Sequence, residues 1–195
     1  MIDFMTISKK IAISCAVGLS IFLLALGLMY RLLHVNHKNF YNSGQMFISE
    51  EMPDFNLPIL GGLDSFVDQN FFKNKVTLMS IWSTNCRTCR HEHAALLNIA
   101  KYLKDKDVHF VGLNCSNNQE QAIEWLNRNG DPYSINLFDP KSVLVAELGS
   151  TGLPDFLIID SYNKIQYRYS GTITNNVWEK NIRPVLDGLY LHTNK

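Results

Sequence analysis

The sequence predicts an α/β fold in which helices flank a central mixed β-sheet, with one N-terminal transmembrane helix ahead of the folded domain. Three observations lead to this prediction. Segments with the periodicity of strands and of helices alternate along the chain, two cysteines lie where an apolar strand-like segment gives way to a helix-like one, and an almost uncharged stretch lies near the N-terminus. We expect an anchor with a short flank at residues 1–34, a tether at 35–50 and the folded domain at 51–195.

Size and composition set the first limits. The chain has 195 residues, enough for one domain of ordinary size plus additional segments. Its 18 Lys and Arg residues balance 18 Asp and Glu residues, so no excess of positive charge indicates a nucleic-acid partner. Four cysteines are too few and too irregularly spaced for a disulfide framework. Only Cys86 and Cys89 form a close pair, because Cys15 lies in the apolar leader and Cys115 stands alone.

Residues 11–33 predict a membrane-spanning helix. Arg31 is the only charged residue in this stretch, and at 1.5 Å per residue the helix spans about 34 Å, enough to cross a bilayer core. A cleaved signal peptide is the alternative, because residues 25–27 offer small side chains at a plausible cleavage position. The apolar run continues to Leu33, which favours an uncleaved anchor. A short N-terminal leader ahead of a whole domain normally exports that domain.

The segments before the cysteine pair carry weaker patterns. Residues 34–50 are polar and aperiodic, as in a tether. Residues 53–58 alternate apolar side chains between two prolines, which permits at most a short edge strand. Gly61 and Gly62 predict a turn, and residues 64–75 predict a loop that leads into the core.

A strand and a helix enclose the cysteine pair. Residues 76–81 are apolar and partly β-branched, which is typical of a buried strand, and residues 90–103 carry apolar side chains at helical spacing. The further elements predicted in the same way are a strand at 108–114, a helix at 118–129 ended by Gly130, a short strand at 135–138, a short helix at 140–148 with Pro140 near its first turn, a hairpin of strands at 155–160 and 165–169, and a helix at about 175–191 kinked by Pro184.

Cys86 and Cys89 have the spacing of a redox-active dithiol at a helix N-terminus. The free N–H groups and the macrodipole favour a negative charge there, so a thiolate at Cys86 is stabilised, and the thiolate is the species that attacks disulfides. Arg87 adds a positive charge that lowers the pKa of Cys86 further. We therefore expect Cys86 to form a mixed disulfide with a substrate and Cys89, one turn further on, to resolve it.

Metal binding is the main alternative use of this pair. The spacing Cys-x-x-Cys-x-His-x-His adds His91 and His93 as candidate zinc ligands. On one helix the four side chains do not all converge, because Cys89 and His93 share a face while His91 points elsewhere. Covalent haem attachment requires a histidine directly after the second cysteine, and Arg90 occupies that position. The pattern therefore favours thiol–disulfide exchange.

The order of the segments, with the cysteine pair at a strand–helix junction and a hairpin followed by a terminal helix, is typical of the thioredoxin layout. That fold places a cis-proline beside the active cysteines, and Pro154 is the candidate because it follows a Gly-rich turn and opens a strand. An ordinary turn proline is the alternative. Glu92 and Asp155 are candidate carboxylates near the thiols, able to accept the proton of Cys89 during resolution. The helix dipole alone also accounts for an acid at Glu92, in the first helical turn.

Several segments carry a more specific resemblance that covers nearly the whole chain. The sequence resembles the DsbE/CcmG family, the membrane-anchored, periplasmic thioredoxin-like proteins of cytochrome c maturation. The resemblance rests on the N-terminal anchor and on residues 53–58, 88–93, 111–114, 130–133, 137–139, 152–155 and 167–171.

The resemblance implies a reductase anchored in the inner membrane by residues 11–33, with its soluble domain in the periplasm. It would receive electrons from a membrane thiol transporter and pass them to CxxCH disulfides of apocytochrome c or to another maturation component. It implies no cofactor other than the redox-active Cys86–Cys89 disulfide.

The family also assigns roles by position. The corresponding residues are the nucleophile Cys86, the resolving Cys89, the cis-proline Pro154 and the acidic residues Glu92 and Asp155, the last standing where Glu is usual. Two positions depart from the family pattern, because Asn85 and Arg87 stand where Trp and Pro are normal. Both departures bear on the reduction potential and on partner choice, since residues around a CxxC pair tune thiolate stability.

Two other functions remain open. An anchored copper metallochaperone of the thioredoxin fold uses Cys-x-x-x-Cys and a distant histidine, whereas this chain has two intervening residues and its late His192 lies in the tail. A general periplasmic disulfide oxidoreductase, not tied to cytochrome c, would have the same composition and the same dithiol. Only the family resemblance separates this second alternative from a role in cytochrome c assembly.

Overall fold

The computed structural model describes residues 18–27, 29, 45–62 and 64–193, and it divides the chain into two units, Met1–Phe40 and Tyr41–Lys195. The elements of the second unit are β1 (Gln45–Glu51), β2 (Asn56–Pro58), β3 (Phe66–Asp68), η2 (Gln69–Phe72), β4 (Val76–Trp82), α2 (Arg87–Leu103), β5 (Val108–Asn114), α3 (Gln119–Asn129), β6 (Ile135–Phe138), α4 (Val143–Glu147), β7 (Asp155–Ile159), β8 (Lys164–Ser170), α5 (Asn175–Val177), η3 (Trp178–Ile182) and α6 (Arg183–Thr193).

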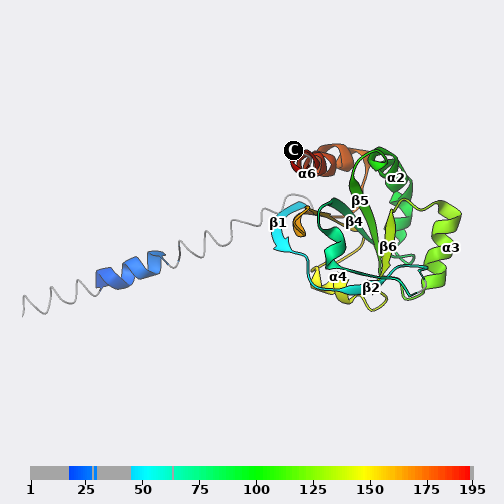
Figure 1. Ribbon diagram of the computed structural model, residues 1–195. Helices are drawn as coiled ribbons and strands as arrows, with labels where there is room; N and C mark the ends of the chain where they lie inside the picture. Colours follow the sequence, from blue (N-terminus) through cyan, green and yellow to red (C-terminus); the bar gives the residue numbers. More distant parts are fainter. Residues whose placement is uncertain (1–17, 28, 30–44, 63, 194–195) are drawn as a thin grey trace, which may run out of the picture. The chain divides into compact units, whose positions relative to one another are not determined.

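A six-stranded mixed sheet forms the centre of this unit, with strand order β1-β8-β7-β4-β5-β6 (Figure 1). β4 pairs in parallel with β5 and antiparallel with β7, and all seven of its residues are buried. β5 and β6 are also parallel. Each parallel pair requires a crossover connection, which α2 provides between β4 and β5 and α3 between β5 and β6. β2 and β3 form a separate two-stranded sheet. The predicted α/β fold with a mixed central sheet flanked by helices is confirmed.

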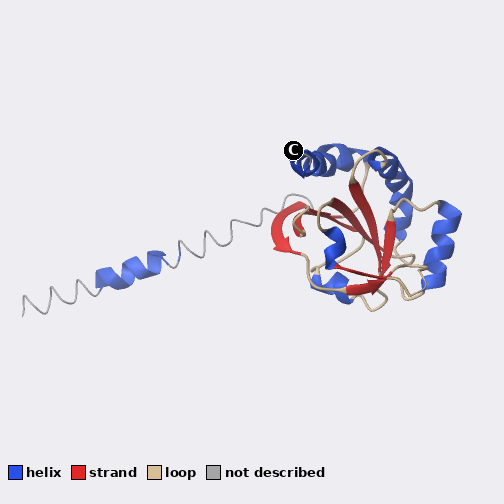
Figure 2. Ribbon diagram, viewed as in Figure 1, coloured by secondary structure: helices blue, strands red, loops and turns tan. Residues whose placement is uncertain are grey.

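Helices cover both faces of the sheet, as Figure 2 shows. On one face, α2, α3, η3 and α6 contribute to a hydrophobic cluster that includes Leu78 of β4 and Leu96 of α2. On the other face, η2 and α4 contribute Phe72 and Leu144 to a second cluster that includes Met79 of β4. Successive residues of β4 therefore point to opposite faces, as the pleat requires. Burial of each such side chain stabilises the fold by about 1.5–3 kcal/mol.

Residues 45–50, expected to belong to the tether, form most of an edge strand instead. β1 pairs antiparallel with β8, and the ring of Phe47 lies edge-on to that of Tyr167 at 5.1 Å. Phe47 is 66% exposed, whereas Ile48, on the other face of the strand, packs against the cluster on the α4 side of the sheet. Pairing with a strand more than a hundred residues away orders this segment, and the domain begins near residue 45 rather than at 51.

In the first unit, the structure describes a helix at residues 18–27. None of the helices in the described parts of the chain has the length and apolarity needed to span a membrane. Much of the predicted span at 11–33 lies outside the described residues, as does the predicted tether up to residue 44.

α4 begins at Val143, three residues later than predicted. The carboxylate of Asp139 accepts the N–H groups of Val143 at 2.9 Å and of Val145 at 3.0 Å. These bonds satisfy N–H groups of the first turn that have no partner within the helix, which fixes the start of α4 beyond Pro140.

The terminal helix consists of three parts. η3 is a π-helical segment, and the N–H of Arg183 at its end donates to the carbonyl of Trp178, five residues earlier. Pro184 then lies in the first turn of α6, where a missing N–H is tolerated. The helix predicted at about 175–191 thus changes from π-helical to α-helical geometry just before Pro184, the residue at which a kink was predicted.

Candidate active site

The cysteine pair lies where the central strand β4 turns into α2. Cys86 caps the helix, with extended backbone angles (φ −79°, ψ 106°), and its sulfur accepts the N–H of Cys89 at 3.0 Å. A sulfur in this position faces the free N–H groups of the first turn and the positive end of the helix dipole. The position of Cys86 at the helix start is therefore as predicted.

Cys86 and Cys89 are joined in a disulfide with an S–S distance of 2.06 Å. Cys86 is half-buried, whereas Cys89 is only 4% exposed and belongs to the hydrophobic cluster under α2. Arg87 and Thr88, between them, are exposed. One sulfur is thus accessible to a partner and the other is shielded, which is the asymmetry that a nucleophilic and a resolving thiol require.

A polar network that the sequence did not reveal fixes the loop before Cys86. The hydroxyl of Ser116 accepts the N–H of Thr84 at 2.9 Å and lies 3.2 Å from the Ser83 hydroxyl and 3.1 Å from the Thr84 hydroxyl. The guanidinium of Arg90 donates to the carbonyl of Thr84. β4 and β5 are parallel neighbours, so the residues that follow each strand meet at one edge of the sheet. This predicted strand order was the only sign in the sequence that Ser116 would lie near Thr84.

Pro154 follows a cis peptide bond, as predicted. It directly precedes β7, whose first residue, Asp155, lies opposite Ile81 of β4. The carbonyl of Pro154 accepts the N–H of Gly171 at 3.0 Å, which joins it to the end of the hairpin. The cis-proline and the cysteine loop therefore flank the same end of the β4–β7 pair.

Glu92 lies one helical turn beyond Cys89 on the buried face of α2. It is 4% exposed, and its Oε2 atom accepts the N–H of Ile173 at 2.8 Å, while Oε1 is buried without a hydrogen-bond partner. Burial raises the pKa of Glu92 from its ordinary value of 4.5 to about 8, although the Ile173 N–H acts in the opposite direction. Residues three apart on a helix are neighbours, so Glu92 is placed beside Cys89.

Asp155 points to the opposite face of the sheet. Its neighbour Phe156 belongs to the cluster under α2, so the alternation of β7 turns Asp155 towards the α4 side. There it accepts the Ser170 hydroxyl at 2.9 Å and faces Arg168 at 3.7 Å, and burial raises its pKa. Of the two predicted carboxylates, only Glu92 shares a face with Cys89.

The histidines near the pair have different environments. His93 is buried, its Nε2 atom is hydrogen-bonded to the carbonyl of Gly130 at 2.9 Å, and its ring packs edge-on against Trp125. Burial lowers the pKa of His93. His91 is exposed on another side of the helix. Within the described ranges, no three His, Cys, Asp or Glu side chains are grouped so that they could hold a metal ion.

Cys115 is a free, half-buried thiol just beyond β5. Its sulfur donates to the carbonyl of Trp82 at 3.5 Å and packs against the cluster on the α4 side of the sheet. Burial raises the pKa of the Cys115 thiol, which disfavours the thiolate.

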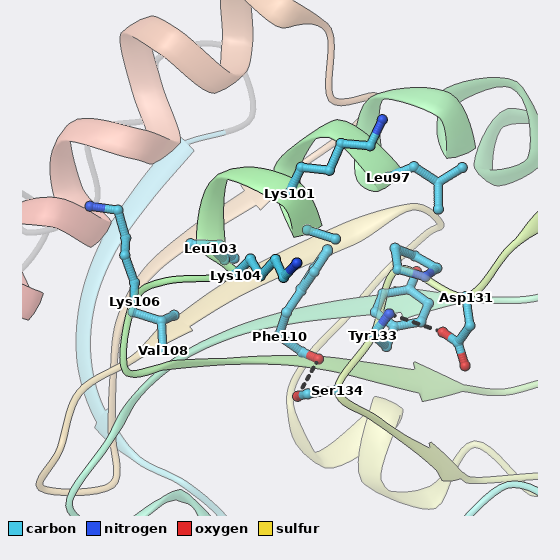
Figure 3. A pocket seen from close by; sticks show the side chains of 12 residues that line it. Leu97, Lys101, Leu103, Lys104, Lys106, Val108, Phe110, Asp131, Tyr133 and Ser134 are labelled. Atoms are coloured by element: carbon cyan, nitrogen blue, oxygen red, sulfur yellow. Dashed lines mark hydrogen bonds between the residues drawn. The ribbon is translucent and has the colours of Figure 1, made fainter.

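A surface pocket of about 520 Å³ lies at the far end of α2 (Figure 3). Its lining includes Leu97 of α2, Lys104 just after that helix, Phe110 of β5 and Tyr133, whose N–H donates to Asp131 at 2.9 Å. None of the predicted site residues lines it. The thiol chemistry is therefore confined to the opposite, N-terminal end of the helix.

Comparisons with known proteins agree with this geometry. A family model described as Redoxin matches residues 48–186. A thiol:disulfide interchange protein DsbE from Vibrio cholerae is 33% identical over 142 residues, which cover 73% of this chain and 75% of the relative. The DsbE of Escherichia coli is 33% identical over 145 residues, covering 74% and 76%. The chain belongs to the DsbE family of thiol:disulfide interchange proteins.

Solved structures show the same fold. A putative DsbE from Chlorobium tepidum has a TM-score of 0.61 at 21% identity and covers 75% of this chain and 97% of its own. A secreted thiol-disulfide isomerase from Corynebacterium glutamicum has a TM-score of 0.65 at 19% identity, with coverages of 80% and 98%. This DsbE-family protein has a thioredoxin-like fold, and its Cys86–Cys89 pair is that of a disulfide oxidoreductase.

Proposed function

We propose that this DsbE-family protein is a reductase for the disulfides of apocytochrome c or of a partner maturation factor. It would be anchored in the inner membrane by a single pass at residues 11–33, with its domain in the periplasm and a membrane thiol transporter as its electron donor. Family membership and the segments at 53–58 and 88–93 support this proposal. The single observation that carries the chemistry is the half-buried Cys86 joined to a buried Cys89 at the start of α2.

The reaction begins from the dithiol form. The Cys86 thiolate attacks one sulfur of the substrate disulfide, forms a mixed disulfide and expels the other substrate sulfur as a thiolate. Cys89 then loses its proton and attacks the Cys86 sulfur. The Cys86–Cys89 disulfide forms, and the second substrate sulfur leaves as a thiolate. Two electrons have passed to the substrate, and a dithiol donor must supply two electrons before the next cycle.

Glu92 is positioned to take the proton of Cys89. Burial raises its pKa to about 8, so the ionised carboxylate is a stronger base than that of an ordinary glutamate. Glu92 also shares the buried face of α2 with Cys89. Asp155 lies on the other face of the sheet and has no such position relative to Cys89.

The test is to trap the substrate on Cys86. A full-length Cys89→Ser variant, expressed in cells that make c-type cytochromes, cannot resolve the mixed disulfide, so its partners remain attached to Cys86. The matched control is the Cys86→Ser, Cys89→Ser double variant, which has no nucleophile. Partners are separated on non-reducing gels and identified by mass spectrometry.

The identity of the trapped proteins decides the outcome. Apocytochrome c or maturation factors, present with Cys89→Ser and absent from the control, support the proposal. A wide range of unrelated envelope proteins would instead indicate a general disulfide oxidoreductase. Tight copper binding by the reduced wild-type chain, with a histidine ligand, would indicate a metallochaperone.

A further inference from the structure

A buried hydroxyl contacts the loop between β4 and α2 at three groups. Ser116 is 1% exposed, and its Oγ atom contacts three groups of the loop: the Thr84 N–H, the Thr84 hydroxyl and the Ser83 hydroxyl. Ser83 in turn accepts the N–H of Asn85 through its hydroxyl and the N–H of Cys86 through its carbonyl. The chain leading to the nucleophile is therefore tied, directly or through one residue, to Ser116.

Ser116 is itself fixed to the sheet. Its N–H donates to the Oδ1 atom of Asn114 at 3.1 Å, and Asn114 is fully buried at the end of β5. Asn114 lies opposite Trp82, the last residue of β4, in the parallel register. The hydroxyl thus has a defined position relative to the strand from which the cysteine loop departs.

Arg90 holds the same loop from the helix. Its guanidinium donates to the carbonyl of Thr84, whereas Ser116 binds the N–H of Thr84. Both backbone polar groups of one residue are therefore bound, one from the sheet and one from α2. The Thr84 backbone is thus held from two sides, which restricts the movement of the loop relative to the helix start.

No residue of the loop restricts the backbone by itself. Residues 83–88 contain no proline, and Asn85, Arg87 and Thr88 are exposed. A proline would have fixed φ locally. The position of the loop therefore relies on hydrogen bonds, among them those of Ser116 and of the Arg90 side chain.

We propose that Ser116 is a positioning residue of the disulfide site, whose hydroxyl, acting with Arg90 on the Thr84 backbone, holds the Cys86 sulfur at the N-terminus of α2. In the reduced protein this places the Cys86 thiolate where it accepts the Cys89 N–H and faces the helix dipole. Loss of the hydroxyl loosens the loop and reduces this stabilisation, so the Cys86 thiol becomes harder to ionise. The inference rests on the dithiol chemistry alone and not on cytochrome c as substrate.

The test compares Ser116→Ala with Ser80→Ala in the reduced full-length chain in detergent. Ser80 is an equally buried serine whose hydroxyl accepts that of Tyr133 at 3.2 Å, away from the cysteine loop. The rate of iodoacetamide alkylation of the Cys86 peptide is followed by mass spectrometry from pH 4 to pH 10. We expect the midpoint to rise by about one pH unit in Ser116→Ala, a roughly tenfold loss of thiolate well below the midpoint, and to stay unchanged in Ser80→Ala.

Each result decides the proposal. An unchanged midpoint in Ser116→Ala, or equal shifts in both variants, overturns it, because the hydroxyl would then act only on general stability. If Ser116→Ala does not fold, Thr84→Val removes one contact of the cluster and keeps the Thr84 N–H bond. A smaller shift in the same direction supports the proposal, and no shift overturns it. Failure here leaves the trapping result with Cys89→Ser unaffected, so the two proposals are tested separately.

Discussion

Replacement of Glu92 by Gln should change how the stability of the domain depends on pH. The folded state holds Glu92 with a pKa of about 8, against 4.5 ordinarily. Below pH 4.5 the group is protonated in both states and costs nothing. As the pH rises above 4.5, the unfolded state loses its proton while the folded state keeps it, so the free energy of unfolding falls. This fall continues until the pH passes the folded-state pKa of about 8, above which both states are ionised.

The magnitude follows from the shift. The difference of 3.5 units (8 − 4.5) corresponds to about 5 kcal/mol when both states are ionised. Most of this loss of unfolding free energy, about 4 kcal/mol, occurs between pH 5 and pH 9. Gln resembles the protonated acid, and its carbonyl can still accept the Ile173 N–H. We therefore expect the stability of Glu92→Gln relative to wild type to increase by about 4 kcal/mol from pH 5 to pH 9.

The assay is guanidinium chloride unfolding of the oxidised protein at each pH, which keeps the disulfide intact and the two thiols from titrating. The quantity of interest is the difference in unfolding free energy between variant and wild type, because other titrating groups, such as His93 with its lowered pKa, cancel in it. Glu147→Gln, which removes an exposed carboxylate of α4, is the matched control. A flat difference for Glu92→Gln would refute the argument that burial raises the pKa of this carboxyl.

Three further substitutions follow from particular contacts. Gly112→Ala would bring a Cβ atom to 2.1 Å from the Oδ1 atom of Asn136, inside the core, so we expect a loss of more than about 3 kcal/mol in chemical denaturation; a loss below 1 kcal/mol would contradict this packing. Asp139→Ala removes the cap of α4 and should cost about 1 kcal/mol in the same assay, with Asp139→Asn closer to wild type. Arg168→Met leaves the buried carboxylate of Asp155 without its ion-pair partner and should cost about 3 kcal/mol at pH 7, part of which a second change, Asp155→Asn, restores; no recovery in the double variant would show that the pair does not contribute.

The sequence predicted those parts of the fold whose signal is local. The buried run of β4, the amphipathic spacing of α2 and the cysteine pair between them needed no knowledge of distant residues, and each is present where expected. Gly130 also ends α3 as predicted, with a positive φ of 90°. These elements place the nucleophile, which is why the chemistry could be predicted before the structure was known.

The missed features depend on contacts between distant segments. β1 is ordered by pairing with β8, a strand more than a hundred residues away in the sequence. Ser116 reaches Thr84 only because β5 lies parallel to β4. Strand alternation implied that Asp155 and Phe156 point to opposite faces, but not which face α2 covers, so the proximity of Asp155 to Cys89 could not be judged from local sequence.

The position of Cys115 has a consequence for the fidelity of exchange. Its sulfur and that of Cys89 lie on opposite sides of a continuous layer of strands. Burial also raises the pKa of the Cys115 thiol, which disfavours the thiolate that would compete with Cys89 for a partner bound at Cys86. We therefore expect exchange to run through Cys86 and Cys89, while Cys115 takes no part in it.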